Sequence, residues 1–135
     1  GTYFRRAQQI VGFAIRRPTF LPFSGIALQK VLLLSSGQEA YIISKYNNDS
    51  GSWMVIRQRS LNARPQTISI PFPPTEKRIA RRPAAIFHFN VTATNQPTGQ
   101  LEILSCLWEH EGSLMELGAP HVSENVLIQV AESIV

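Results

Sequence analysis

Residues 101–118, LEILSCLWEHEGSLMELG, hold two apolar runs separated by a short polar turn, and they decide the fold. We predict a strand over residues 101–109, a turn at His110-Glu111-Gly112, and a returning strand over residues 113–117 that Gly118-Ala119-Pro120 ends. So short a connection joins antiparallel strands, because parallel strands need a long crossover. The stretch therefore predicts an antiparallel hairpin.

The chain before this hairpin continues the same pattern. Residues 28–34, 41–46, 53–59 and 85–92 are apolar enough for strands, and polar turns separate most of them. In the last of these segments Phe87, Phe89 and Val91 share one face, which places His88 on the solvated face. Short loops between successive strands favour an antiparallel meander.

Both ends of the chain have helical patterns. Apolar residues recur at helical spacing from Tyr3 to Val11, and Gly12 ends that pattern. Near the other end, Ser123 is suited to cap a helix with Glu124 in its first turn. The expected fold is therefore one α+β domain over residues 1–135, a twisted, meander-like antiparallel sheet with both helices packed on one side. The expected apolar face of the terminal helix consists of Val126, Leu127, Val130, Ala131 and Ile134.

Residues 60–84 interrupt the strand pattern. Prolines at 65, 71, 73, 74 and 83 remove backbone donors, so most of this segment cannot pair as a central strand. We predict a long, Pro-rich, basic loop, with a short edge strand at residues 67–70 and one helical turn within residues 75–82. A loop of this length inside a compact domain is typical of a functional segment.

The charge of the chain is unevenly distributed. All 13 basic residues lie in residues 1–82 with only Glu39, Asp49 and Glu76, which gives that part +10, whereas residues 83–135 carry −6. No apolar run approaches the roughly 18 residues of a membrane-spanning helix. Cys106 is the one cysteine, so an intramolecular disulfide is excluded. Length and hydropathy are those of an ordinary globular domain.

Three groups of residues along the chain resemble one known pattern. The first is Val11-Gly12-Phe13 with Pro18, Leu21 and Pro22, the second Tyr46 with Val55 and Gln58, and the third runs from Trp108 to Ile134 through Gly112, Leu117-Gly118, Ser123-Glu124, Leu127 and Ala131-Glu132-Ser133. Together they resemble a bacterial domain family of unknown function found in the extracytoplasmic parts of putative anti-sigma factors and lipoproteins. Leu114 and Met115 depart from it where the family often has a Tyr.

This resemblance implies an α+β domain outside the cytoplasmic membrane, anchored to it in the full-length protein, with no catalytic activity. On that basis we expect a non-catalytic sensing or partner-binding module of a membrane-tethered regulator or lipoprotein. The partner would be an unidentified protein or envelope ligand. No cofactor is expected.

The candidate catalytic and metal-binding residues favour a structural interpretation. Cys106 lies in the middle of a predicted strand, where a buried, unreactive thiol is far commoner than a nucleophile. His88, His110 and His121 lack the spacing of a metal site, which needs three or four convergent ligands. We predict no catalytic residue and no metal, although an enzyme that uses Cys106 or the His110 turn remains a weaker alternative.

The basic cluster, Lys77, Arg78, Arg81 and Arg82, is the main candidate binding site. With other arginines it could bind an anionic cell-wall polymer or lipid headgroups, because guanidinium groups pair well with phosphate and carboxylate. The competing interpretation is that glutamates of the later strands neutralise it. Nucleic acid is not expected, since no recognition helix or aromatic stacking pattern is present. The other arginines are Arg5, Arg6, Arg16, Arg17 and Arg64, and the glutamates are Glu102, Glu109, Glu111 and Glu116.

Overall fold

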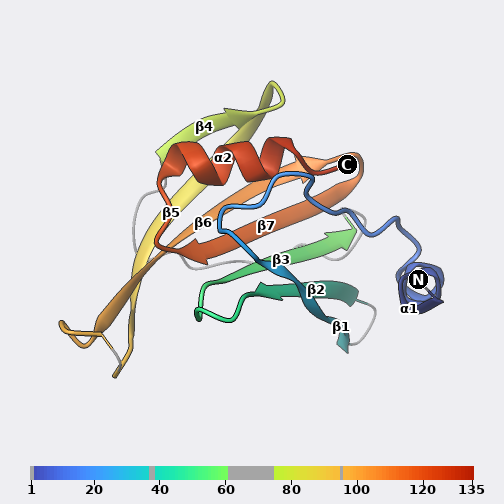
Figure 1. The fold of residues 1–135 in the computed structure, drawn as a ribbon. Coiled ribbons are helices and arrows are strands. Elements are labelled where there is room, and N and C mark those ends of the chain that lie inside the picture. Colours follow the sequence, from blue (N-terminus) through green and yellow to red (C-terminus); the bar gives the residue numbers. More distant parts are fainter. Residues whose placement is uncertain (1, 37–38, 61–74, 95) are drawn as a thin grey trace.

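The computed structural model describes residues 2–36, 39–60, 75–94 and 96–135, and a large antiparallel sheet dominates it (Figure 1). The described residues form two helices, α1 (Thr2–Val11) and α2 (Glu124–Glu132). They also form seven strands: β1 (Ala27–Ser36), β2 (Glu39–Asn47), β3 (Trp53–Ser60), β4 (Thr75–Ile79), β5 (Arg82–Thr92), β6 (Gln100–His110) and β7 (Ser113–Pro120).

The sheet consists of two meanders joined along their inner strands. Its order is β1-β2-β3-β7-β6-β5-β4, and every pairing is antiparallel. The acidic second part of the chain therefore lies beside the basic first part, with Arg57 opposite Glu116 where β3 meets β7. Basic and acidic strands, which are separated in the sequence, are therefore partly interleaved in the sheet.

The hairpin predicted from residues 101–118 is present as β6 and β7. Its strands pair with Trp108 opposite Met115 and His110 opposite Ser113. His110 therefore ends β6, and the turn is only Glu111-Gly112, both with positive φ. Strand β7 continues to Pro120 instead of ending at Leu117, because the sheet keeps Ala119 opposite Leu104.

Helix α2 covers one face of the sheet, and the core lies between them (Figure 1). Ser123 caps the helix as predicted, with its Oγ accepting from the Val126 N–H at 3.2 Å. The buried side chains on the helix are Leu127, Val130 and Ala131, with Ile134 following it, and they belong to one core with Met54, Ile56, Ile86, Leu104, Cys106, Met115 and Leu117. The prediction that both helices pack together on one side of the sheet is right only for α2. Helix α1 contacts β2, lies apart from α2 and contributes no described side chain to this core.

The buried face of β5 is opposite to the predicted one. Ala84 and Ile86 point into the core under α2, whereas Phe87 is half-buried on the other face and Val91 is 37% exposed. The error has a physical reason: both faces of this strand carry apolar residues, so alternation alone does not fix which face is covered. His88 is exposed, as predicted, but it lies on the α2 side of β5.

The helical turn predicted within residues 75–82 of the segment 60–84 is wrong. Residues 75–79 form β4, and β5 begins at Arg82, so no helical turn is present there. The predicted strand at residues 67–70 lies outside the described residues. Pairing with β5 overrides the weak helical signal, because β4 buries Ile79 in the core.

Gln58 joins the N-terminal segment to the sheet. Its amide Nε2 donates to the Ala14 oxygen at 2.7 Å and to Ser113 Oγ at 3.0 Å, and its Oε1 accepts from the Arg16 N–H at 2.9 Å. The side chain is 2% exposed, so these bonds satisfy a buried polar group. Gln58 is one of the residues that carry the family resemblance, and its role here is to position the chain.

Ser133, another of those residues, joins the end of α2 to the Pro18–Pro22 region. Its Oγ accepts from the N–H groups of Thr19 at 3.1 Å and Phe20 at 3.0 Å, and it donates to the Val130 oxygen at 2.7 Å. Beside it, Pro18 bridges Ile134 in antiparallel fashion. The segment that follows α1 is therefore fastened to the C-terminal end of the chain.

Candidate anion-binding hairpin

Strands β4 and β5 form a hairpin with a two-residue turn, Ala80-Arg81, which projects beyond α2 (Figure 1). Both turn residues are left-handed, with φ of 49° for Ala80 and 69° for Arg81. Such a turn suits the twist of a hairpin but is usually made with Asn or Gly, because a Cβ costs roughly 1 kcal/mol or more in this region. The turn is therefore strained, and it places Arg81 at its tip.

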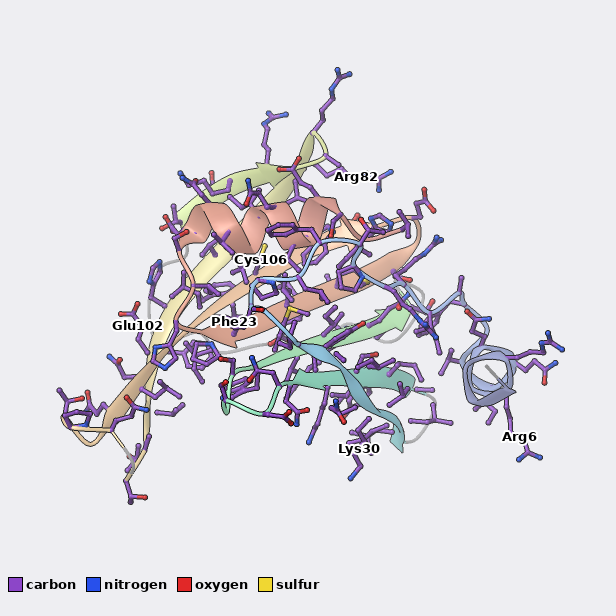
Figure 2. The ribbon with its side chains drawn as sticks, in the orientation of Figure 1. Arg6, Phe23, Lys30, Arg82, Glu102 and Cys106 are labelled. Carbon is purple, nitrogen blue, oxygen red and sulfur yellow. The ribbon has the colours of Figure 1, made fainter. Side chains whose placement is uncertain are left out.

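The hairpin brings the basic cluster together and exposes it. Lys77, Arg78, Arg81 and Arg82 are all exposed. Alternation places Lys77 and Arg82 on the α2 side of the sheet and Arg78 on the opposite side. Figure 2 shows Arg82 at the outer end of the hairpin. The positive charge therefore reaches solvent on both faces and at the tip.

The expected neutralisation by glutamates is absent from the described part of the chain. Its ion pairs are Arg16 with Glu111 at 2.9 Å, and His88 with Glu124 at 3.2 Å and Glu102 at 3.7 Å. Two of the four candidate glutamates, Glu111 and Glu102, therefore pair with residues outside the basic cluster. Glu116 accepts a hydrogen bond from Ser105 at 3.5 Å, and Glu109 lies near the cluster without an ion pair to it.

The other arginines that the structure describes do not extend the cluster. Arg5 and Arg6 lie on α1, and Figure 2 shows Arg6 well away from Arg82. Arg16 is paired with Glu111, and Arg17 lies in the segment that bridges the C-terminal residues. Arg64 falls outside the described residues. Within the part of the chain that the structure describes, the candidate site is therefore the β4–β5 hairpin.

An open groove of about 1060 Å³ lies beside the hairpin. Its lining includes Ala85, Leu107 and Leu114, which alternation places on the face of the sheet opposite α2. The side chains of Glu76 and Arg78 border it on the β4 side. This groove was not predicted from the sequence. Its one signal there is the run of small residues Pro83-Ala84-Ala85, which lies in β5.

A smaller cavity of about 220 Å³ lies between the hairpin turn, the β6–β7 turn and the end of α2. Trp108 and His110 line it, and the Trp108 Nε1 is buried without a hydrogen-bond partner in the part of the chain that is described. Burial lowers the pKa of His110, and the nearby cations Arg16 and Arg82 lower it further, while Glu111 opposes them. The imidazole is therefore predominantly neutral near neutral pH.

Cys106 lies in the core with no exposed surface. Burial raises the pKa of its thiol to about 12, which disfavours the thiolate that nucleophilic chemistry needs. The histidines are on separate elements, His88 in β5, His110 at the end of β6, and His121 after β7. Among the described residues, no group of three or more His, Cys, Asp or Glu is arranged to hold a metal ion.

Comparison of the chain with family models, with curated proteins and with solved structures gave no match. The resemblance noted above therefore depends on the quoted motif residues alone. Within the described residues, no helix has the length and apolar character to cross a membrane.

Proposed function

We propose that this chain is a non-catalytic binding module and that its basic hairpin, residues 75–86 of β4 and β5, contacts an anionic partner. The observation that carries the proposal is the exposure of four cations on one hairpin, with no ion pair to any described acidic residue. If acidic side chains paired with these four cations, no such exposed positive surface would remain. Arginine forks bind carboxylate and phosphate in two-point fashion, so the chemistry of the partner is anionic.

The strained turn supports a binding role for the hairpin. A turn of Ala80-Arg81 is less stable than one containing glycine, yet it presents a long cation where glycine would present nothing. Backbone strain of this kind clusters at functional sites, where function rather than stability selects the residue type. The raised pKa of the Cys106 thiol supports the non-catalytic part of the proposal.

The cellular setting of the proposal comes from the family resemblance. An extracytoplasmic domain, anchored to the membrane in the full-length protein, would meet partner proteins, cell-wall polymers and lipid headgroups. Its role would be that of a sensing or partner-binding part of an anti-sigma-factor-like regulator or a lipoprotein. A second candidate, an electrostatic adhesion module for anionic polymer or headgroups, is favoured by the same exposed cations.

Binding to heparin and to vesicles of phosphatidylglycerol with phosphatidylcholine tests the proposal. We expect binding that weakens with salt, because the cations are exposed and screened. Arg81→Glu with Arg82→Glu should weaken it by about tenfold or more, since two favourable contacts become repulsive. The matched control is Lys30→Glu with Lys45→Glu, two exposed cations on β1 and β2. Equal loss in both double variants, or binding that salt does not weaken, would refute the hairpin as the site.

A further inference from the structure

The outer edge of β4 is the starting observation. β4 is the last strand of the sheet, and among the described residues no strand pairs with its outer side. Ile79 and Arg82 close the two-residue turn as a hydrogen-bonded pair, so Lys77 and Ala84 form the next bonded pair. The N–H and C=O groups of Glu76 and Arg78 therefore point outward. The edge offers two donors and two acceptors to an added strand.

The charges on this edge select what can pair with it. Lys77 and Arg78 are exposed, as are Thr75 and Glu76. In the antiparallel register that uses the outward groups of both Glu76 and Arg78, two copies of the edge would place Lys77 opposite Lys77 and Arg78 opposite Glu76. Like charges on paired strands, here the two copies of Lys77, are destabilising. Charged residues are a common protection of edge strands against self-pairing. An acidic strand, in contrast, gains from Lys77 and Arg82, both of which lie on the α2 side.

The groove gives the added strand an apolar surface as well. It lies on the face to which Glu76 and Arg78 point, and it continues inward over Ala85 and Leu107. Ala85 is short and half-buried, so it leaves room beside β4 for a side chain of the added strand. Burying apolar area there stabilises the bound strand in addition to the hydrogen bonds of the edge.

We infer that an acidic, extended segment of a partner protein adds to β4 as an antiparallel strand, and this inference rests on the proposed anion-binding role of the hairpin. Strand addition uses main-chain hydrogen bonds for affinity and alternate side chains for specificity. The partner is therefore recognised by its backbone as well as by its charge. A polymer or a lipid surface has no peptide N–H and cannot make these bonds.

The register dictates the pattern of the partner sequence. Residues opposite Glu76 and Arg78 point to the groove side, and their N–H groups face β4. These residues are apolar. The residues between them are acidic, face Lys77 and Arg82 on the α2 side, and direct their own N–H groups to solvent. The structure thus assigns a partner segment in which apolar and acidic residues alternate.

Three capped peptides of alternating Glu and Val test this assignment by fluorescence anisotropy. One is unmodified, one carries N-methyl groups on its Val residues, and one carries them on its Glu residues. All have the same charge. Methylation of Val should weaken binding by at least about tenfold, because it removes the N–H groups that face β4. Methylation of Glu should change affinity by no more than about twofold, since those N–H groups face solvent.

Each other outcome has a distinct meaning. If both methylated peptides bind as well as the unmodified one, charge alone drives binding, so strand addition is wrong and the proposed function survives. If neither the peptide nor heparin binds, the proposed function fails as well. Ala85→Phe should weaken the unmodified peptide several-fold while leaving heparin binding unchanged. Replacing Val by Ala in the peptide gives the same check without any risk to folding, and an unchanged affinity in both tests would contradict the role of the groove.

Discussion

Arg78 and Arg81 are joined across the β4–β5 turn, where the Arg78 Nη1 donates to the main-chain oxygen of Arg81 at 3.5 Å. The bond spans a turn whose two central residues are both left-handed and neither of which is glycine. A side chain of the basic cluster thus supports the conformation that exposes the rest of that cluster. The stability of the hairpin and its charge are determined by the same residues.

Removing the Cβ of Ala80 should stabilise the protein. Ala80→Gly relieves a residue held at φ 49°, and this gain exceeds the extra entropy of glycine in the unfolded chain. We expect the free energy of unfolding in urea to rise by about 0.5–1 kcal/mol. Ala85→Gly, in the neighbouring strand, is the control and should lower it by about 1 kcal/mol. A loss of stability in Ala80→Gly would show that the turn is not strained.

Replacing Gln58 should destabilise the fold strongly. Gln58→Leu removes three hydrogen bonds and leaves the Ala14 oxygen and the Arg16 N–H without their partner. We expect a loss of about 3 kcal/mol in the free energy of unfolding, measured with urea. The control is Gln129→Ala, an exposed glutamine on α2, which should change it by less than about 0.5 kcal/mol. Similar losses in both variants would mean that Gln58 does not position the N-terminal segment.

The lowered pKa of His110 predicts a pH-dependent stability. The folded protein binds a proton at His110 less tightly than the unfolded chain does. The contribution of His110 to the free energy of unfolding is therefore complete when the pH is above 6.5, the ordinary pKa of histidine. It is lost as the pH falls below that value toward the folded pKa. In His110→Gln, the free energy of unfolding should therefore fall less between neutral and mildly acidic pH than in the wild type.

An NMR titration of the imidazole measures this pKa directly. Because Arg16 and Arg82 contribute to lowering it, Arg82→Glu should raise the pKa of His110 toward its ordinary value. A wild-type pKa above 6.5, or no change in the variant, would contradict the described environment of the cavity.

The Cys106 thiol should be inert in the folded protein. Its pKa of about 12 and its complete burial leave little thiolate and no access for a reagent. A thiol-reactive disulfide probe should therefore label it at the rate of unfolding, and quickly only in denaturant. Fast labelling of the native protein would contradict this burial and would favour the alternative that Cys106 is a nucleophile.

Much of the sheet could be predicted from local patterns. The predicted turn at His110-Glu111-Gly112 and the apolar runs on both sides predict β6 and β7, although His110 proves to belong to β6, and Ser123 predicts the start of α2. Sequence reasoning went wrong where tertiary pairing decides the outcome. The segment containing Lys77 has a weak helical signal, but pairing with β5 and the burial of Ile79 make it a strand.

The candidate site could be predicted only in part. The four cations are evident in the sequence, whereas their exposure depends on where the glutamates lie, and Glu111 turns out to pair with Arg16. The groove needed the structure, because Ala85 and Leu107 are distant in sequence and meet only through the register of β5 and β6. The role of Gln58 needed it too, since its partners come from two segments far apart in the sequence, residues 14–16 and the start of β7.

The most direct test of the central claim is to map bound anion onto the backbone amides by NMR. Heparin added to the labelled protein should shift the amides of residues 76–82 most, with smaller shifts at Arg5 and Arg6 on α1 and at Lys30 on β1. Salt should reverse those shifts, because the contacts are exposed. The largest shifts at α1 or at β1 and β2, with residues 76–82 unmoved, would contradict the assignment of the basic hairpin as the binding surface.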